Sequence, residues 1–141
     1  MSSYDCTLSG NIMSLLYGDN FVDASIVPSY GLYSVFANSG SGEYFLRNCT
    51  DISNLKMPAT YVGNDGYSSL FNGATKISSA PDLPATSIEN RAYSSMFTNC
   101  TELLEAPDLP ATTIGTYCYS SMFQNCAKLN KVPDTLPATV L

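Results

Sequence analysis

Cysteine and aspartate are the residues of this chain that could do chemistry, and histidine is absent. Without an imidazole, neither a Ser-His nor a Cys-His nucleophile pair can form. The five cysteines include no CxxC pair, and no imidazole can complete a metal shell around them. We therefore expect no enzyme, no catalytic residue, no metal site and no cofactor.

Three of the cysteines share one position of a repeat described below, namely Cys49, Cys100 and Cys126, and a further copy has Ala74 there. A position that accepts Cys or Ala behaves as a small buried hydrophobic site. Neighbouring copies could bring Cys100 and Cys126 within disulfide reach, since Cα separations of ~4.4–6.8 Å are allowed. Side chains of a ladder point in parallel, however, so we favour buried free thiols over a disulfide.

The aspartates Asp82, Asp108 and Asp134 also recur at one position, each directly after a proline. One interpretation is a row of calcium ligands, and the other is a local bond from each carboxylate to a backbone N–H at a corner. Calcium takes roughly six to eight oxygen ligands. One aspartate per copy, with no second acidic position nearby, supplies too few, so we favour the local bond.

These residues recur because the chain repeats itself. The letters APDLPAT at 80–86 return at 106–112, and VPDTLPAT fills 132–139. Each copy belongs to a longer unit, and the units begin at equivalent tyrosines that follow one another at 26 residues: Tyr67, Tyr93 and Tyr119. Self-similarity at a period of roughly 20–50 residues is typical of stacked repeats.

The repeats define the expected domain organisation. The solenoid spans 42–141, with units near 42–66, 67–92, 93–118 and 119–141. Residues 1–41 do not match the unit, apart from an aromatic fragment, YSVFANSGS, at 33–41. We expect an N-terminal cap over 1–41, with the apolar stretch NIMSLLYGDNF at 11–21 as its plug.

Each unit is expected to hold one short helical turn and one short strand. YSSMFTNC at 93–100 has two adjacent apolar residues after a pair of serines, which suits one helical or 3-10 turn. TELLEAPDLP at 101–110 predicts a short strand that ends near its prolines, because proline cannot donate to a ladder. PATTIG at 110–115 then predicts an extended corner. The predicted fold class is a β-rich α/β solenoid.

The stretch LPATTIGTYCYSSMFQNCAKLNKVPD resembles a known repeat. Its residues fall in order on the pattern of the BspA-type, or Treponema-type, leucine-rich repeat at Pro110, Ile114, Gly115, Phe123, Cys126 and Leu129. The match covers about 42–141, and the 26-residue unit is slightly longer than the family's commoner one. The resemblance implies a leucine-rich-repeat solenoid with one short strand and one short helical or 3-10 turn per unit.

The resemblance also implies a function. Proteins of this family lie on bacterial cell surfaces in adhesion and matrix-binding contexts, and similar repeats occur in proteins linked to bacteriophage particles. We therefore expect a non-enzymatic, surface-exposed recognition or adhesion module that binds a protein or a glycan. An extracellular or cell-surface location follows from the resemblance, and a virion is the alternative.

Charge and hydropathy exclude other partners. The net charge is −6, and only six Lys and Arg are spread over the chain, so no cluster is available for phosphates and we expect no nucleic-acid binding. The apolar run IMSLLY at 12–17 is too short to span a bilayer, and we expect no membrane insertion. No signal-peptide pattern precedes that run.

A ligand surface is expected where the copies differ from one another beside their shared apolar positions. On the predicted strands these variable positions form a candidate binding face: Ser53, Asn54, Ser78, Ser79, Leu104, Glu105, Asn130 and Lys131. Variation within a uniform ladder is what a recognition face needs. Unconstrained surface would vary in the same way, so both interpretations remain open.

The C-terminal end offers a second candidate surface. The sequence stops at LPATVL, partway through a unit, although solenoids normally need a polar cap over their last repeat. Val140 and Leu141 fall where a following unit would continue. Either the natural chain is longer, or, if 141 is the natural terminus, we expect these two residues to form a docking end. The alternative function is then a structural component, in a phage particle or as a spacer in a larger surface protein, that docks or forms a homo-oligomer through this end.

Overall fold

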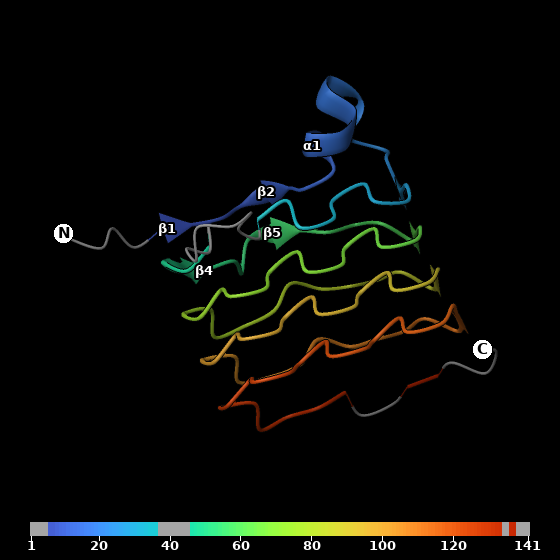
Figure 1. Ribbon diagram of the computed structural model, residues 1–141. Helices are drawn as coiled ribbons and strands as arrows, with labels where there is room; N and C mark the ends of the chain where they lie inside the picture. The colour runs from blue at the N-terminus through green and yellow to red at the C-terminus, as the bar shows by residue number, and fades with distance from the viewer. Residues whose placement is uncertain (1–5, 37–45, 134–135, 138–141) are drawn as a thin grey trace.

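The computed structural model describes residues 6–36, 46–133 and 136–137. In these residues the chain runs through successive coils that lie one above another, as Figure 1 shows. The strands are two or three residues long, and all strand pairs in the described residues are parallel. Stacking of coils, rather than long elements, therefore builds the molecule.

Two small sheets join the first coil to the second. β1 (Cys6–Thr7) pairs with β4 (Cys49–Asp51), and β2 (Gly10–Asn11) pairs with β5 (Leu55–Lys56). Leu55 points into the core while Lys56 is exposed, as the alternation of side chains along a strand requires.

The largest sheet crosses four coils in the order β3-β6-β7-β8. Its strands are β3 (Ile26–Val27), β6 (Tyr61–Val62), β7 (Ser87–Ile88) and β8 (Thr113–Ile114). The second residues of these strands are paired in register and form an inward column of β-branched side chains, Val27, Val62, Ile88 and Ile114.

The sheet lies one segment later in the unit than the sequence predicts. β8 falls in PATTIG, the expected corner, whereas the expected strand at 101–110 contains only an isolated bridge from Glu105 to Lys131. Prolines interrupt that segment at 107 and 110. β-Branched Thr113 and Ile114 follow the prolines and pair in register with β7.

The segment 93–100 forms consecutive turns where we expected a helical turn. Alternate residues donate their N–H to the next coil, as Tyr93 does to Cys118 O (3.1 Å) and Phe97 to Met122 O (2.9 Å). The residues between them donate three positions back, as Met96 does to Tyr93 O (3.1 Å). A helix would keep all these bonds within one coil, whereas this alternation also ties each coil to its neighbour.

Left-handed backbone at regular intervals permits this alternation. In 91–100 the residues with positive φ are Arg91 (53°), Ser95 (55°) and Asn99 (63°), and the same positions recur in the next copy. Non-glycine residues are strained in the left-handed region, and Asn is the least strained of them. The strain persists because hydrogen bonds on both sides of the segment fix its conformation.

Aromatic rings stack through the core in two columns. Phe71 and Phe97 lie with ring centroids 5.4 Å apart, and Phe97 and Phe123 lie 5.8 Å apart. Tyr67 and Tyr93 are fully buried and stack at 5.8 Å. The columns arise because equivalent residues of successive copies occupy the same place in successive coils.

All five cysteines are free thiols in the structure. The Cys100 thiol donates to Phe71 O (3.3 Å) and the Cys126 thiol to Phe97 O (3.1 Å), so each bonds to the preceding coil rather than to the other sulfur. Burial raises the pKa of the Cys100 thiol. Cys100 is buried, as the favoured interpretation requires, whereas Cys126 is half-buried.

Residues 6–36, which we expected to lie in a cap, run as a coil of the stack. Ile26 of β3 is paired with Tyr61, whereas Tyr61 in turn is paired with Ser87, so the spacing to the next coil is longer at the N-terminal end. Residues paired between these two coils are 45 apart at Gly10 and Leu55 but 35 apart at Ile26 and Tyr61, so the first coil carries an insertion between β2 and β3. This insertion, at residues 13–24, contains α1 (Ser14–Tyr17) and η1 (Gly18–Asn20). This insertion hides the repeat from a sequence alignment at constant period.

The expected plug at 11–21 is only partly internal. Ile12 and Met13 are buried, whereas Leu15 and Tyr17 are exposed. No helix in the described part of the chain is long and apolar enough to cross a membrane.

Candidate functional site

The eight residues of the predicted binding face are all exposed. Two hollows, of about 670 Å³ and about 540 Å³, lie along this side of the stack. Ser79, Ala80 and Asp82 line both hollows, so the two adjoin. We call them together the strand-side groove.

The groove brings together most of the predicted residues. Ser53 and Asn54 line the first hollow, and the second is lined by Ser78, Leu104, Glu105 and Lys131. Asn130 is exposed but lies outside both linings.

Backbone bonds between coils hold the groove residues in line. The Leu104 N–H donates to Ser78 O (3.1 Å), and the Asn130 N–H donates to Leu104 O (3.0 Å). Leu103 points into the core, so the chain turns Leu104 and Glu105 outward between two inward positions. The variable side chains therefore project from a fixed backbone.

The groove carries more negative than positive charge. Glu105 is paired with Lys131 at 3.4 Å, but both side chains are mostly exposed, so the ion pair contributes little to stability. Asp82 and Asp108 are exposed in the groove walls. With Lys56 at the other end, three carboxylates face two ammonium groups, which favours a neutral or cationic partner.

The local bonds expected for the aspartate row are not formed in the described residues. Neither Asp82 nor Asp108 has a hydrogen-bond or ion-pair partner there, because their side chains point to solvent rather than back to the corner. Asp134 lies outside the described residues. The local bond occurs instead at Asp51, which accepts the Ser53 N–H (2.8 Å). Hydrogen bonding from the Ser53 side chain, and then from its N–H, lowers the pKa of the Asp51 carboxyl.

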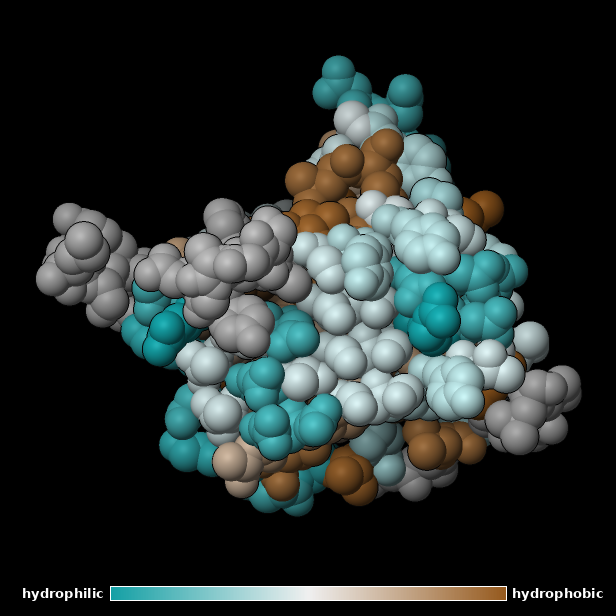
Figure 2. All heavy atoms as spheres, viewed as in Figure 1, coloured by the Kyte–Doolittle hydropathy of each residue, from teal (hydrophilic) through white to brown (hydrophobic). Residues whose placement is uncertain are grey.

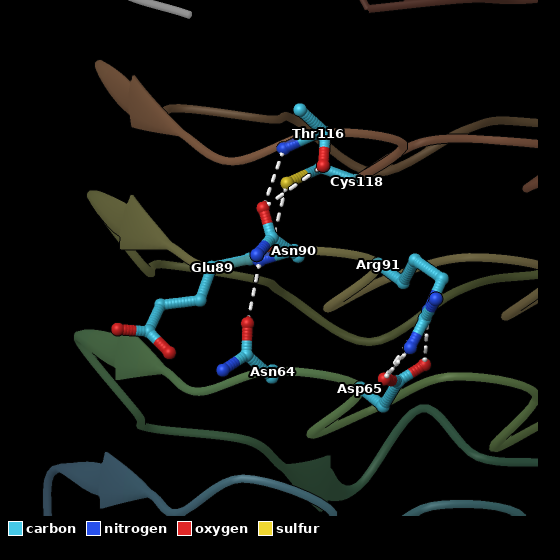
Figure 3. A network of polar contacts seen from close by, with 7 residues as sticks. All are labelled: Asn64, Asp65, Glu89, Asn90, Arg91, Thr116 and Cys118. Carbon is cyan, nitrogen blue, oxygen red and sulfur yellow. Dashed lines mark hydrogen bonds and ion pairs between the residues drawn. The ribbon is translucent and has the colours of Figure 1, made fainter.

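A second polar cluster, which sequence reasoning missed, lies on the turn segments (Figure 3). Asp65 accepts three hydrogen bonds from the Arg91 guanidinium, two from Nε at 3.0 Å and 3.2 Å and one from Nη2 at 2.9 Å. The Asp65 side chain is only 6% exposed, whereas that of Arg91 is 54% exposed. The bonds to Asp65 raise the pKa of Arg91.

Asn90 extends this cluster between coils. Its side-chain oxygen accepts from the Thr116 N–H (2.9 Å) and hydroxyl (3.0 Å), and its own N–H donates to the side chain of Asn64 (3.1 Å). Asn64 and Asn90 are 26 residues apart, as are Asp65 and Arg91, and that recurrence was the available signal. Every bond of the cluster joins neighbouring coils, so it holds the stack together rather than forming a reactive site.

The described residues contain no group of three or more His, Cys, Asp or Glu side chains placed to hold a metal ion. Comparison of the chain with protein-family models, with curated proteins and with solved structures found no match.

Proposed function

We propose that this chain is a leucine-rich-repeat solenoid that acts as a non-enzymatic recognition or adhesion module. It binds an extended segment of a protein, or a glycan, along the strand-side groove. The observation that supports this is the groove itself, which crosses successive coils and is lined by the residues that differ between copies. A surface exposed on a bacterial cell, or on a virion, is the proposed location.

The groove suits a ligand that runs along the stack. Its residues repeat once per coil, so a linear partner would meet similar backbone but different side chains at each step. Pro81, Pro84 and Leu104 supply apolar lining, and the carboxylates supply polar contacts. The first hollow is mainly apolar and the second mainly polar, so the two together offer apolar contact beside polar groups that can fix a ligand's orientation.

A screen of the purified chain against an immobilised glycan array and a peptide library tests the proposal. Binders should include extended neutral or cationic molecules. Leu104→Asp and Glu105→Lys should weaken a groove binder at least tenfold, while Ser120→Lys, an exposed change away from the groove, should leave its affinity unchanged. Equal effects of all three changes, or no binder on either array, would count against the groove.

The second candidate function is a structural component that attaches through its C-terminal end. Exposed apolar side chains on the last coil favour it, with Tyr117 74% exposed, together with a hollow of about 600 Å³ lined by residues 114–120. The expected docking residues Val140 and Leu141 lie outside the described residues. Light scattering coupled to size exclusion tests this candidate, because stable assemblies of the purified chain would support it.

A further inference from the structure

The last coil presents a row of backbone donors. In the preceding coil, alternate N–H groups donate to the next coil over 2.8–3.1 Å, from Arg91, Tyr93, Ser95 and Phe97. The equivalent N–H groups of the last coil have no acceptor among the described residues: Tyr117, Tyr119, Ser121 and Phe123. A segment that covers this edge must therefore supply carbonyl oxygens at every second residue.

The first coil presents the matching row of acceptors. In the second coil, Asn64 O accepts from the Tyr30 N–H (2.7 Å) and Gly66 O accepts from the Leu32 N–H (2.9 Å). The equivalent carbonyls of the first coil, on Ser29, Gly31 and Tyr33, accept no hydrogen bond from the described residues. One end of the stack therefore offers donors and the other offers acceptors.

The two rows share one register. If a second copy continued the stack below the last coil, the Tyr117 N–H would face its Ser29 O, and the Tyr119 N–H would face its Gly31 O. The Phe column would continue as well, because Phe36 stacks on Phe71 at 6.4 Å within one copy and Phe123 ends the column at the other end.

Both ends are also apolar. Tyr30, Tyr33 and Val35 are exposed on the first coil, and Tyr117 and Val132 are exposed on the last. Figure 2 shows apolar, brown atoms around α1 near the upper end and along the lower edge of the molecule, with pale and teal atoms across the middle. Large exposed apolar side chains are a feature of interaction sites.

The insertion at 13–24 stands in the way of such stacking. α1 rises above the first coil in Figure 1, at the end where another copy would add. Leu16 and Phe21 pack against the core, and the Tyr17 hydroxyl donates to Ile26 O (2.8 Å) on the edge strand β3. In the second coil the same corner takes only residues 58–60, so it has no such projecting segment.

We propose that the two ends of the stack are complementary docking surfaces for a second copy of this chain, and that the insertion at 13–24 blocks their union. The proposal is independent of the strand-side groove. It goes beyond the second candidate function and is distinguishable from it, because self-assembly through the C-terminal end expects assemblies of the wild-type chain, whereas a blocked N-terminal end expects a monomer. Uncovered sheet edges promote uncontrolled association, and natural proteins use projecting segments to prevent it.

The test is a variant that lacks residues 14–23. It keeps Met13, Ala24 and Ser25 as a three-residue corner like that at 58–60. Light scattering and electron microscopy should show elongated assemblies whose mass grows several-fold with protein concentration, while the wild-type chain stays monomeric. A folded deletion variant that remains a monomer would overturn the proposal, as would elongated assemblies of the wild-type chain, which would support self-assembly under the second candidate function instead.

Two controls separate ordered stacking from aggregation. Wild-type chain added to the deletion variant should shorten its assemblies, because the wild-type C-terminal end can dock while its blocked N-terminal end stops growth. In the deletion background, Tyr33→Glu on the first coil should abolish assembly, whereas Leu104→Glu in the groove should not. Assemblies that neither the wild-type chain nor Tyr33→Glu reduces would be non-specific aggregates and would overturn the proposal.

Circular dichroism establishes whether the deletion variant is folded. If it is not, the double substitution Leu16→Ser and Phe21→Ser releases the insertion from the core without shortening the chain. This variant should form dimers or larger species as its concentration rises, with the same response to Tyr33→Glu. A monomer at all concentrations would overturn the proposal.

Discussion

The segments 93–100 and 119–126 have nearly the same sequence, YSSMFTNC and YSSMFQNC, but different environments. Phe97 and Cys100 are fully buried, whereas Phe123 and Cys126 are half-buried. The first segment has a coil on both sides, and the second has a described neighbour on one side only. Burial in this molecule is therefore set by the position of a copy in the stack and not by its local sequence.

The aromatic column should show the largest difference between the two segments. Phe97→Ala should cost ~3–5 kcal/mol of unfolding free energy, because a buried ring leaves a cavity between two coils that cannot collapse. Phe123→Ala should cost about half as much, because the ring is only half-buried. Denaturant unfolding followed by circular dichroism measures both, and equal losses would mean that another segment covers 119–126 in solution.

Loss of charged contacts between coils should have the next largest effect on the free energy of unfolding. Arg91→Met should destabilise the protein, because it leaves the buried Asp65 carboxylate without its three hydrogen bonds from the guanidinium. Lys128→Met is the matched control, since Lys128 and Glu102 pair at 2.6 Å but are both largely exposed. Its loss should stay below ~0.5 kcal/mol in the same unfolding assay. A larger loss for Lys128→Met would reverse the ranking of the two pairs.

Substitutions in the tyrosine column should raise the free energy of unfolding, whereas those described above lower it. The hydroxyls of Tyr67, Tyr93 and Tyr119 are buried without a hydrogen-bond partner in the described residues. Tyr93→Phe should therefore leave stability unchanged or raise it by up to ~1 kcal/mol, because an unpaired buried hydroxyl costs free energy. Tyr119→Phe, at the half-buried end of the column, should gain less. A clear loss of stability for Tyr93→Phe would show that its hydroxyl has a partner in solution.

Substitution of the buried thiols should have the smallest effect on the free energy of unfolding at neutral pH. This effect should grow as the pH becomes alkaline. Burial raises the pKa of Cys100 above its ordinary value of 9.0, and burial also raises that of Cys126. A raised pKa in the folded state stabilises the protein fully below pH 9, and that stabilisation is lost as the pH rises through the folded value.

Unfolding curves from pH 7 to pH 11 test this dependence. Cys100→Ala should make it shallower without abolishing it, because burial also raises the pKa of Cys118 and of the stacked tyrosines. A thiol reagent gives an independent measure. It should modify the exposed Cys6 readily and Cys126 more slowly, and it should modify Cys100 only upon unfolding. Equal protection of Cys100 and Cys126 would remove the difference between the two segments.

Sequence reasoning located the variable positions but not the elements that carry them. The pair at 104 and 105 stood out because neighbouring copies differ there, and the structure leaves both residues exposed beside a hollow. That these residues bind a ligand stays a prediction. The expected helical turn at 93–100 and strand at 101–110 follow local patterns, and hydrogen bonds between coils override both.

The coil at 6–36 shows a different limit of sequence reasoning. The backbone of this coil pairs with the second coil through β1, β2 and β3, yet its amino-acid sequence does not match that of the later copies. Parallel pairing needs only backbone groups and side chains of suitable size, so a coil can join the stack without sharing the consensus. The spacing also departs from 26 residues, with partners 35 apart at Ile26 and Tyr61 and, because of the 13–24 insertion, 45 apart at Gly10 and Leu55.

The sequence by itself determined the period of 26 residues, the inward apolar columns and the acidic, histidine-free composition, because each is a property of residue types and their spacing. Only the tertiary structure decided which coil is sandwiched and which is open, that the first coil joins the stack, and that donors lie at one end and acceptors at the other. These features depend on which coils lie next to each other. The sequences at 93–100 and 119–126 are nearly identical, so local sequence cannot account for their different neighbours.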